Sequence, residues 1–174
     1  GYKIWQKLLT PLLLSDEKPI ANTNAGKVAG FKEGNINVFK GIPFAAPPVG
    51  DLRWKAPQEV KAWSGVKDCI RFAASPMQFD PVPFMCWSEE FLIPKKPIDE
   101  DCLYLNVWAK NTATKKPVLV YIYGGGFVSG GAGCAIYDGK EMAEKDVVFV
   151  TINYRVGVFG FLAHPELTKE SGYG

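Results

Sequence analysis

Residues Pro117–Phe127 read Pro-Val-Leu-Val-Tyr-Ile-Tyr-Gly-Gly-Gly-Phe, and they decide the fold. The apolar run Val118–Ile122 is rich in β-branched residues and too short to form a helix, so it predicts a buried strand of a parallel sheet. The three glycines that follow, Gly124–Gly126, allow positive φ angles and a close approach of other atoms. A glycine loop after a buried strand commonly either binds a phosphate or points backbone N–H groups at a developing oxyanion.

The residues after the glycines argue against phosphate binding. A P-loop requires Gly-x-x-x-x-Gly-Lys-Ser/Thr, and no Lys-Ser or Lys-Thr follows these glycines. A dinucleotide-binding fingerprint requires glycines that open a helix, whereas residues Phe127–Gly131 continue as a loop. A purely structural turn would rarely need three glycines together. We therefore favour the oxyanion interpretation over both alternatives.

A second apolar segment, Val147–Ile152, predicts another buried strand. Between the two strands, Lys140–Lys145 is long enough for about one and a half helical turns. A strand, a crossover and a second strand form a βαβ-like unit, which requires a parallel sheet. The predicted fold class is therefore α/β.

The amino-terminal half predicts antiparallel strands and irregular loops. Segments Lys27–Phe31 and Ile36–Lys40 are typical of a hairpin around the turn residues Glu33–Asn35. Residues Gly41–Gly50 contain three prolines, so we expect a rigid extended loop there and neither a helix nor a central strand. Leu103–Trp108 alternates well enough to predict one further strand.

The segment between Cys69 and Cys102 shows almost no periodicity and carries many aromatic residues and prolines. A structureless stretch of this length inside a compact domain is usually functional or covalently tethered. Its aromatic side chains either line a pocket or fix the loop to the body of the protein. We favour the second role for most of them.

The composition excludes several classes of function. The chain has 174 residues, of which 20 are basic and 18 acidic without any long basic block, so we expect no nucleic-acid binding. No run of 18 apolar residues occurs, so we expect no membrane span. With a single histidine and no Cys-x-x-Cys, the sequence predicts no zinc site, and we expect no metal and no other cofactor.

The first residues predict a leader or arm. Lys3–Ser15, in which two lysines are followed by a leucine-rich run, resembles the end of a secretory signal, although no Ala-x-Ala cleavage site follows. A short terminal helix or a disordered arm is the alternative interpretation. We place the arm at residues 1–19 and the domain at residues 20–174. Together with the four cysteines, the leader favours a secreted or periplasmic location.

Four motifs resemble the amino-terminal third of the type-B carboxylesterases, the carboxylesterase/cholinesterase family of α/β-hydrolases. They occur in the family's order and at its usual spacing. The motifs are Phe39–Ala45 with Pro47–Trp54, Glu100–Val107, Tyr123–Phe127, and Asn153–Gly157 with Phe159–Leu162. The resemblance implies an incomplete α/β-hydrolase fold, with amino-terminal antiparallel strands, the first parallel strands of the central sheet, and long loops.

The resemblance also implies a role for the glycine loop. Gly125 and Gly126, supported by Gly124, are similar to the family's oxyanion hole, in which backbone N–H groups stabilise the charge of a tetrahedral intermediate. In addition, Cys69 and Cys102 match the family's first disulfide, whose loop borders the mouth of the active-site gorge.

Further residues take roles from the same resemblance. Arg53 and Glu100 match a buried ion pair at the base of the long loop. Trp87, Phe127 and Tyr123 are candidates for the wall of the gorge. The Trp87 side chain invites comparison with the choline-binding tryptophan of cholinesterases, but its distance from the following cysteine differs, and packing at the gorge rim is the interpretation we favour.

Four other residues need separate expectations. Arg155 is expected to pair with an acidic residue beyond the present end of the chain. Cys86 and Cys134 match no position of the family pattern, and either can be a free thiol. His164 is far from the family's carboxyl-terminal catalytic position, so we interpret it as a surface loop residue.

The nucleophile elbow Gly-x-Ser-x-Gly does not occur in this sequence. In the family the serine, the acidic residue and the histidine of the triad all come later in the chain. We therefore expect residues 20–174 to be the amino-terminal part of a serine carboxylesterase, truncated before the elbow and inactive alone. Its expected partners are a small carboxylic ester and the carboxyl-terminal portion of the same protein. The alternative is a non-catalytic, cholinesterase-like adhesion or binding protein.

Overall fold

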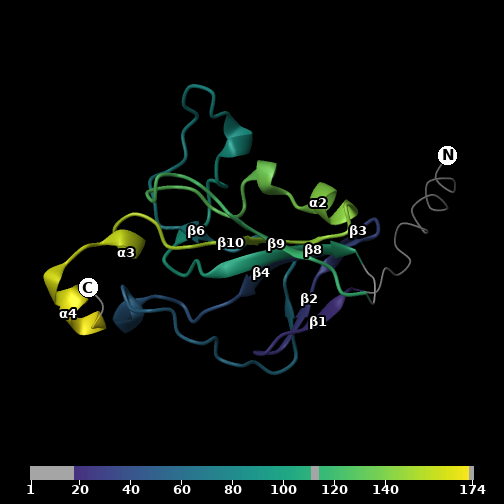
Figure 1. Ribbon diagram of the computed structural model, residues 1–174, viewed down its shortest axis with the longest axis horizontal. Helices are drawn as coiled ribbons and strands as arrows, with labels where there is room; N and C mark the ends of the chain where they lie inside the picture. The colour runs from purple at the N-terminus through teal and green to yellow at the C-terminus, as the bar shows by residue number, and fades with distance from the viewer. Residues whose placement is uncertain (1–17, 111–113, 173–174) are drawn as a thin grey trace, which may run out of the picture.

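The computed structural model describes residues 18–110 and 114–172. A five-stranded mixed sheet forms its centre, in the strand order β3-β4-β8-β10-β9 (Figure 1). The pairs β3/β4, β4/β8 and β8/β10 are antiparallel, and β10/β9 is parallel. The strands are β3 (Phe31–Glu33), β4 (Ile36–Pro43), β8 (Tyr104–Lys110), β9 (Val118–Ile122) and β10 (Val148–Ile152).

This sheet confirms the predicted fold class, α/β with amino-terminal antiparallel strands followed by a first parallel pair. The crossover from β9 to β10 contains helix α2 (Lys140–Glu144), which packs over β8 and β10 (Figure 1). The core between α2 and the sheet consists of five buried residues: Ile36, Val38, Trp108, Ala143 and Phe149. The leader or arm predicted at residues 1–19 lies, up to residue 17, outside the described residues.

Strand β9 is exposed, so the prediction that it is buried was wrong. It is the outer strand of the sheet, and within the described part of the chain it pairs only with β10. Val118 and Ile122 are 61% and 63% exposed. β10 lies between β8 and β9, so its Phe149 and Thr151 are buried. An apolar run indicates that a strand can be buried, but its burial also requires a neighbouring strand on each side.

The amino-terminal hairpin is formed by other residues than predicted. β3 and β4 form the hairpin, but Lys27–Ala29 is strand β2 of a separate sheet with β1 (Ile20–Asn22) and β5 (Val66–Asp68). The two segments divide at Gly30, where a Cβ would lie 2.1 Å from the carbonyl oxygen of Val38. Only glycine allows the chain to pass so close to β4 as it changes sheets.

Residues Gly41–Pro43 belong to β4, contrary to the expectation that they lie in a loop. Ile42 and Pro43 pair with β8 after a register shift that follows Phe39. β3 has already ended at this level, so the missing N–H of Pro43 interrupts no ladder on that side of β4. The extended loop begins only after Pro43.

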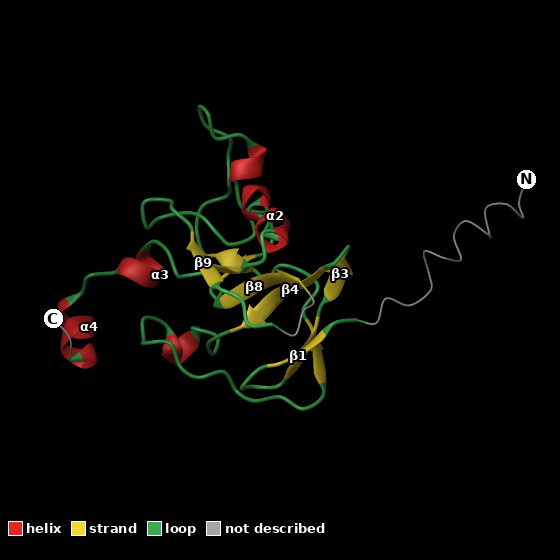
Figure 2. Ribbon diagram, turned by 45° about the vertical axis from the view of Figure 1, so that its right-hand side comes forward, coloured by secondary structure: helices red, strands yellow, loops and turns green. Residues whose placement is uncertain are grey.

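The long segment after Cys69 is irregular, as predicted. It contains a two-residue parallel pair, β6 (Ser75–Pro76) with β7 (Ile98–Asp99), and its tip projects away from the sheet (Figure 1). Helices α3 (Val158–Phe161) and α4 (Pro165–Ser171) lie to one side of the sheet rather than on it (Figure 2). The short 3₁₀ turns are Gly50–Leu52, Glu89–Phe91 and Ala135–Tyr137.

The structure does not contain the disulfide implied for Cys69 and Cys102, because both are free thiols. They are buried in different core clusters. The Cys69 Sγ lies 3.7 Å from the carbonyl oxygen of Gly41, and Cys102 packs with Ala45 and Leu103. Each thiol therefore acts as a small apolar core group. Burial raises the pKa of Cys69, and it raises the pKa of Cys102 to about 12.

A chain of buried and part-buried hydrogen bonds crosses the central sheet. The Gly41 N–H donates to Asn106 Oδ1 at 2.9 Å, and Asn106 Nδ2 donates to Thr151 Oγ1 at 2.9 Å. The Thr151 hydroxyl donates to the carbonyl oxygen of Ala132 at 3.3 Å. These bonds connect β4, β8 and β10 with the loop that follows the three glycines.

Replacing the middle of this chain is expected to destabilise the protein. Asn106→Leu leaves the Gly41 N–H without its acceptor and removes one of the two hydrogen bonds of the buried Thr151 hydroxyl, so we expect the free energy of unfolding to fall by about 2–4 kcal/mol. Urea unfolding of the full-length protein measures this. Asn22→Leu, on the exposed side of β1, is the control and should change it by less than about 0.5 kcal/mol. Equal effects of the two substitutions would contradict the assignment.

The free Cys102 thiol predicts a loss of stability at high pH. Its pKa is about 12 in the fold and about 9 in the unfolded chain, so folding favours the protonated thiol. The contribution is complete below pH 9 and is lost as the pH rises through 12, at up to about 1.4 kcal/mol per pH unit. Cys102→Ala should flatten this slope in alkaline urea unfolding, and Cys86→Ala, at an exposed position, should not. A slope unchanged by Cys102→Ala would refute the prediction.

Candidate oxyanion site

The candidate site is the turn that follows β9. Residues 124–129 are all exposed, and φ is 132° at Gly125 and 61° at Gly126. A Cβ at Gly125 would lie 2.0 Å from the carbonyl oxygen of Ser129. The turn therefore requires glycine at this position for its φ angle and for the close approach of the returning chain.

Four consecutive backbone N–H groups in this turn, those of residues 124–127, donate to no acceptor among the described residues, and the pair of interest lies at Gly125 and Gly126. The Gly125 carbonyl oxygen accepts the N–H groups of Val128 and Ser129, both at 3.2 Å, and this closes the turn. The N–H groups of Gly125 and Gly126 donate to no acceptor among the described residues. Both residues are exposed, so an anionic oxygen can reach two adjacent donors.

Tyr123 fixes the start of the turn and does not line a gorge wall, because it is only 2% exposed. Its hydroxyl donates to the Tyr154 carbonyl oxygen at 2.8 Å, and the Tyr154 hydroxyl donates to the Tyr123 carbonyl oxygen at 2.8 Å. The two rings stack at 4.4 Å between centroids. Burial raises the pKa of both phenols, so the hydroxyls remain donors.

The other two candidates for a gorge wall are exposed. Phe127 is 62% exposed, and its ring centroid lies 4.8 Å from that of Phe161. The Phe127 carbonyl oxygen accepts the Gly157 N–H at 2.7 Å. Trp87 is 53% exposed and makes an edge contact with Phe91 in its own loop, at 5.4 Å. Phe127 is thus part of the glycine turn, whereas Trp87 packs within the projecting long loop.

Sequence reasoning missed two side chains that hold the loop after the glycines. Asn153 accepts the Ala132 N–H on Oδ1 at 2.8 Å and donates from Nδ2 to the Ala74 carbonyl oxygen at 3.0 Å. Gln78, from the long loop, binds the backbone of Gly130. Asn153 is the first residue of the motif Asn153–Gly157, so the sequence could have indicated its importance. Nothing in the sequence marks Gln78.

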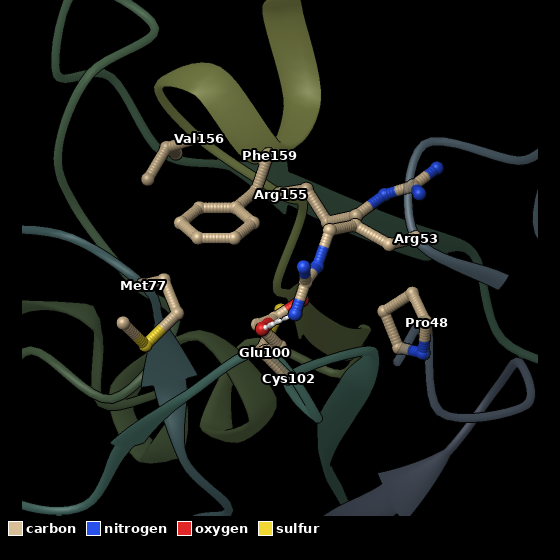
Figure 3. A pocket seen from close by; sticks show the side chains of 8 residues that line it. All are labelled: Pro48, Arg53, Met77, Glu100, Cys102, Arg155, Val156 and Phe159. Carbon is tan, nitrogen blue, oxygen red and sulfur yellow. Dashed lines mark hydrogen bonds and ion pairs between the residues drawn. The ribbon is translucent and has the colours of Figure 1, made fainter. Parts of the chain in front are cut away.

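Arg53 and Glu100 form the implied ion pair beside this region. Arg53 Nε donates to Glu100 Oε2 at 2.6 Å and Nη2 donates to Oε1 at 2.5 Å. The pair is partly exposed rather than buried, with side-chain exposures of 39% and 19%. Hydrogen bonding to Glu100 raises the pKa of the Arg53 guanidinium. Figure 3 shows the pair in a small pocket lined by Pro48, Arg53, Met77, Glu100, Cys102, Arg155, Val156 and Phe159.

Arg155 and His164 behave differently from each other. The Arg155 Nη1 is buried and has no hydrogen-bond partner among the described residues. That it pairs with an acidic residue outside the given sequence stays a prediction. His164 is exposed, but it is more than a loop residue: its Nδ1 accepts the Glu166 N–H at 3.3 Å and so caps helix α4.

Within the described ranges, no group of three or more His, Cys, Asp or Glu side chains could hold a metal ion. The helices of the same ranges are all too short or too polar to cross a membrane.

The mixed sheet and the glycine turn after its first parallel strand define a partial α/β-hydrolase fold. Two solved structures of PNB esterase match it. One has a TM-score of 0.79 and 36% sequence identity, and covers 89% of this chain and 31% of that chain. The other has a TM-score of 0.75 and 38% identity, over 89% and 30% of the two chains.

Residues 17–172 match the model of the Carboxylesterase family, and the chain belongs to this family. It is 46% identical over 164 residues to fumonisin B1 esterase of Sphingopyxis macrogoltabida, covering 91% of this chain and 28% of the relative. It is 40% identical to acetylcholinesterase of Bungarus fasciatus, over 87% and 26% of the two chains. It is 41% identical to phenmedipham hydrolase of Pseudarthrobacter oxydans, over 84% and 30%. The chain thus spans less than a third of the length of these relatives.

The reciprocal hydrogen bonds of the two tyrosines predict a measurable contribution to stability. Tyr123→Phe and Tyr154→Phe each remove one hydroxyl donor but keep the stacked ring. We expect each substitution to lower the free energy of unfolding by about 1–2 kcal/mol, because a part-buried carbonyl oxygen loses its donor. Urea unfolding of the full-length protein measures both. Unchanged stability in both variants would show that water replaces these bonds at no cost.

Proposed function

We propose that this chain supplies the oxyanion hole of a serine carboxylesterase, which hydrolyses carboxylic esters through an acyl-enzyme. The observation that carries the proposal is the pair of adjacent N–H groups, at Gly125 and Gly126, that lack an acceptor among the described residues. Family membership supports it, since the relatives named above include two esterases and a hydrolase. The substrate class proposed is a carboxylic ester.

The proposed chemistry relies on backbone donors. As a nucleophile attacks the ester carbonyl carbon, negative charge develops on the carbonyl oxygen, and two fixed N–H groups stabilise that charge more than they stabilise the neutral ester. A Cβ at Gly124 or Gly126 would meet no atom within 4 Å, so the space beside the donors is open to a substrate. The hydrogen bonds that close the turn fix the donors before the reaction begins.

The nucleophile must come from elsewhere. The sequence has no Gly-x-Ser-x-Gly elbow, and a serine without a general base is a poor nucleophile. We therefore propose that the triad belongs to a further portion of the same protein, and that this portion pairs with the exposed outer strand β9. The exposure of Val118 and Ile122 supports a partner at this place.

We also retain a secreted or periplasmic location as a proposal. It rests on the leader-like residues Lys3–Ser15, which lie outside the described residues, and on the cysteine content. Cell fractionation of the native host tests it, and recovery of the protein with cytoplasmic markers would overturn it.

The decisive experiment removes one donor. Gly126→Pro deletes an N–H group and forces φ away from 61°. Gly34→Pro is the matched control, since Gly34 has a φ of 63° and, like Gly126, no atom within 4 Å of a Cβ. In the full-length protein, we expect Gly126→Pro to lower kcat for a p-nitrophenyl ester by about 10²–10³-fold. We expect Gly34→Pro to affect stability only.

Two outcomes contradict the proposal. Equal kcat values for the two proline variants would exclude Gly126 as a donor. A coding sequence that continues without a serine-containing elbow would support the non-catalytic binding protein instead. The isolated 174-residue chain should not hydrolyse the ester, and turnover above that of its Gly126→Pro variant would refute this expectation.

A further inference from the structure

One side chain outside the glycine turn makes three hydrogen bonds next to it. Gln78 Nε2 donates to the carbonyl oxygen of Gly130 at 2.7 Å and to that of Pro76 at 2.9 Å. Gln78 Oε1 accepts the Gly130 N–H at 2.9 Å. The carboxamide therefore binds both backbone polar groups of Gly130, as a neighbouring strand would, and uses three of its four hydrogen-bonding positions.

Gly130 touches the beginning of the glycine turn. A Cβ at Gly130 would lie 2.6 Å from the carbonyl oxygen of Gly124, and its φ is 109°. The preceding residue, Ser129, donates its N–H to the Gly125 carbonyl oxygen. Gln78 thus fixes the residue at which the returning chain contacts the segment that carries the two free donors.

The turn has little else to hold it. Residues 124–129 are exposed, and apart from its own closing bonds the turn receives the Gly157 N–H at Phe127 and the Phe161 ring contact. An exposed segment with few packing contacts opens locally at low free energy. Its geometry therefore depends on the hydrogen bonds at its two ends, which come from Tyr154 at the start and Gln78 at the return.

We propose that Gln78 is a positioning residue for ester hydrolysis. It holds Gly130, and through Gly130 it keeps the N–H groups of Gly125 and Gly126 in the arrangement that the oxyanion requires. This inference rests on the proposed function. Gln78 does not touch the oxyanion, and its loss displaces the donors without deleting them. A displacement of about 1 Å at a reacting centre can cost about 10²-fold in rate.

The long loop after Cys69 thereby gains a role in the reaction. Gln78 lies two residues after β6, and β6 is held by β7 near the other end of the loop. Asn153 also connects this loop, through Ala74, to the segment that contains Ala132. The loop is therefore a support for the glycine turn.

The test compares two glutamines. Gln78→Met keeps the length and approximate volume of the side chain but removes its hydrogen bonds. Gln58→Met is the matched control, since Gln58 is exposed and its side chain donates, among the described residues, only to the nearby Ala56 carbonyl oxygen, at 2.8 Å. In the full-length protein, we expect Gln78→Met to lower kcat for p-nitrophenyl acetate by about 10–100-fold and to change KM by less than about three-fold. Gln58→Met should leave both constants unchanged.

A second readout does not depend on activity. Hydrogen–deuterium exchange of the peptide that spans residues 123–131 should be faster in Gln78→Met and unchanged in Gln58→Met. Unchanged exchange together with unchanged kcat overturns the inference. A lower melting temperature with kcat and exchange of this peptide both unchanged also overturns it, because it indicates a purely structural role. If the unmodified protein hydrolyses no ester, the proposed function fails, and the exchange result alone decides whether Gln78 fixes the turn.

Discussion

The candidate site depends on a chain of buried hydrogen bonds that leaves the central sheet and enters the glycine-rich loop. Asn106 and Thr151, on neighbouring strands, bind each other, and Thr151 also binds the carbonyl oxygen of Ala132. Asn153 binds the N–H of the same residue. Both polar groups of Ala132 are thus bound in a buried environment, where an unsatisfied group would cost about 1–3 kcal/mol. The loop can take few other positions without losing these bonds.

A rigid support is necessary because the groups proposed to act on a substrate belong to the backbone. The two glycine N–H groups have no side chain that packing could hold, and the turn that contains them is exposed. Three elements compensate for this: the paired tyrosines before the turn, the Gly157 N–H bound to Phe127 within it, and Gln78 after it. An exposed turn is thereby held by hydrogen bonds from a buried part of the protein, which is the arrangement that preorganised electrostatic stabilisation requires.

Local patterns explain which parts of this arrangement could be predicted. The apolar runs and the glycines at 124–126 predicted two parallel strands and the turn after the first, since strand preference and positive φ are properties of short segments. The hairpin prediction was wrong at Lys27–Ala29 because the chain changes sheets at Gly30. This change depends on the close approach of Gly30 to the Val38 carbonyl oxygen. The implied disulfide was wrong because Cys69 and Cys102 are buried in separate clusters.

By itself, the sequence determined the strands β9 and β10, the glycine turn and the family to which the chain belongs, because these follow from short motifs and their order. The tertiary structure alone decided that β9 is an outer strand, that Tyr123 is buried, and which side chains hold the turn. These features depend on contacts between distant residues, and no local pattern encodes them. Gln78 and Gly130 are 52 positions apart, and only the fold brings the carboxamide of one to the backbone of the other.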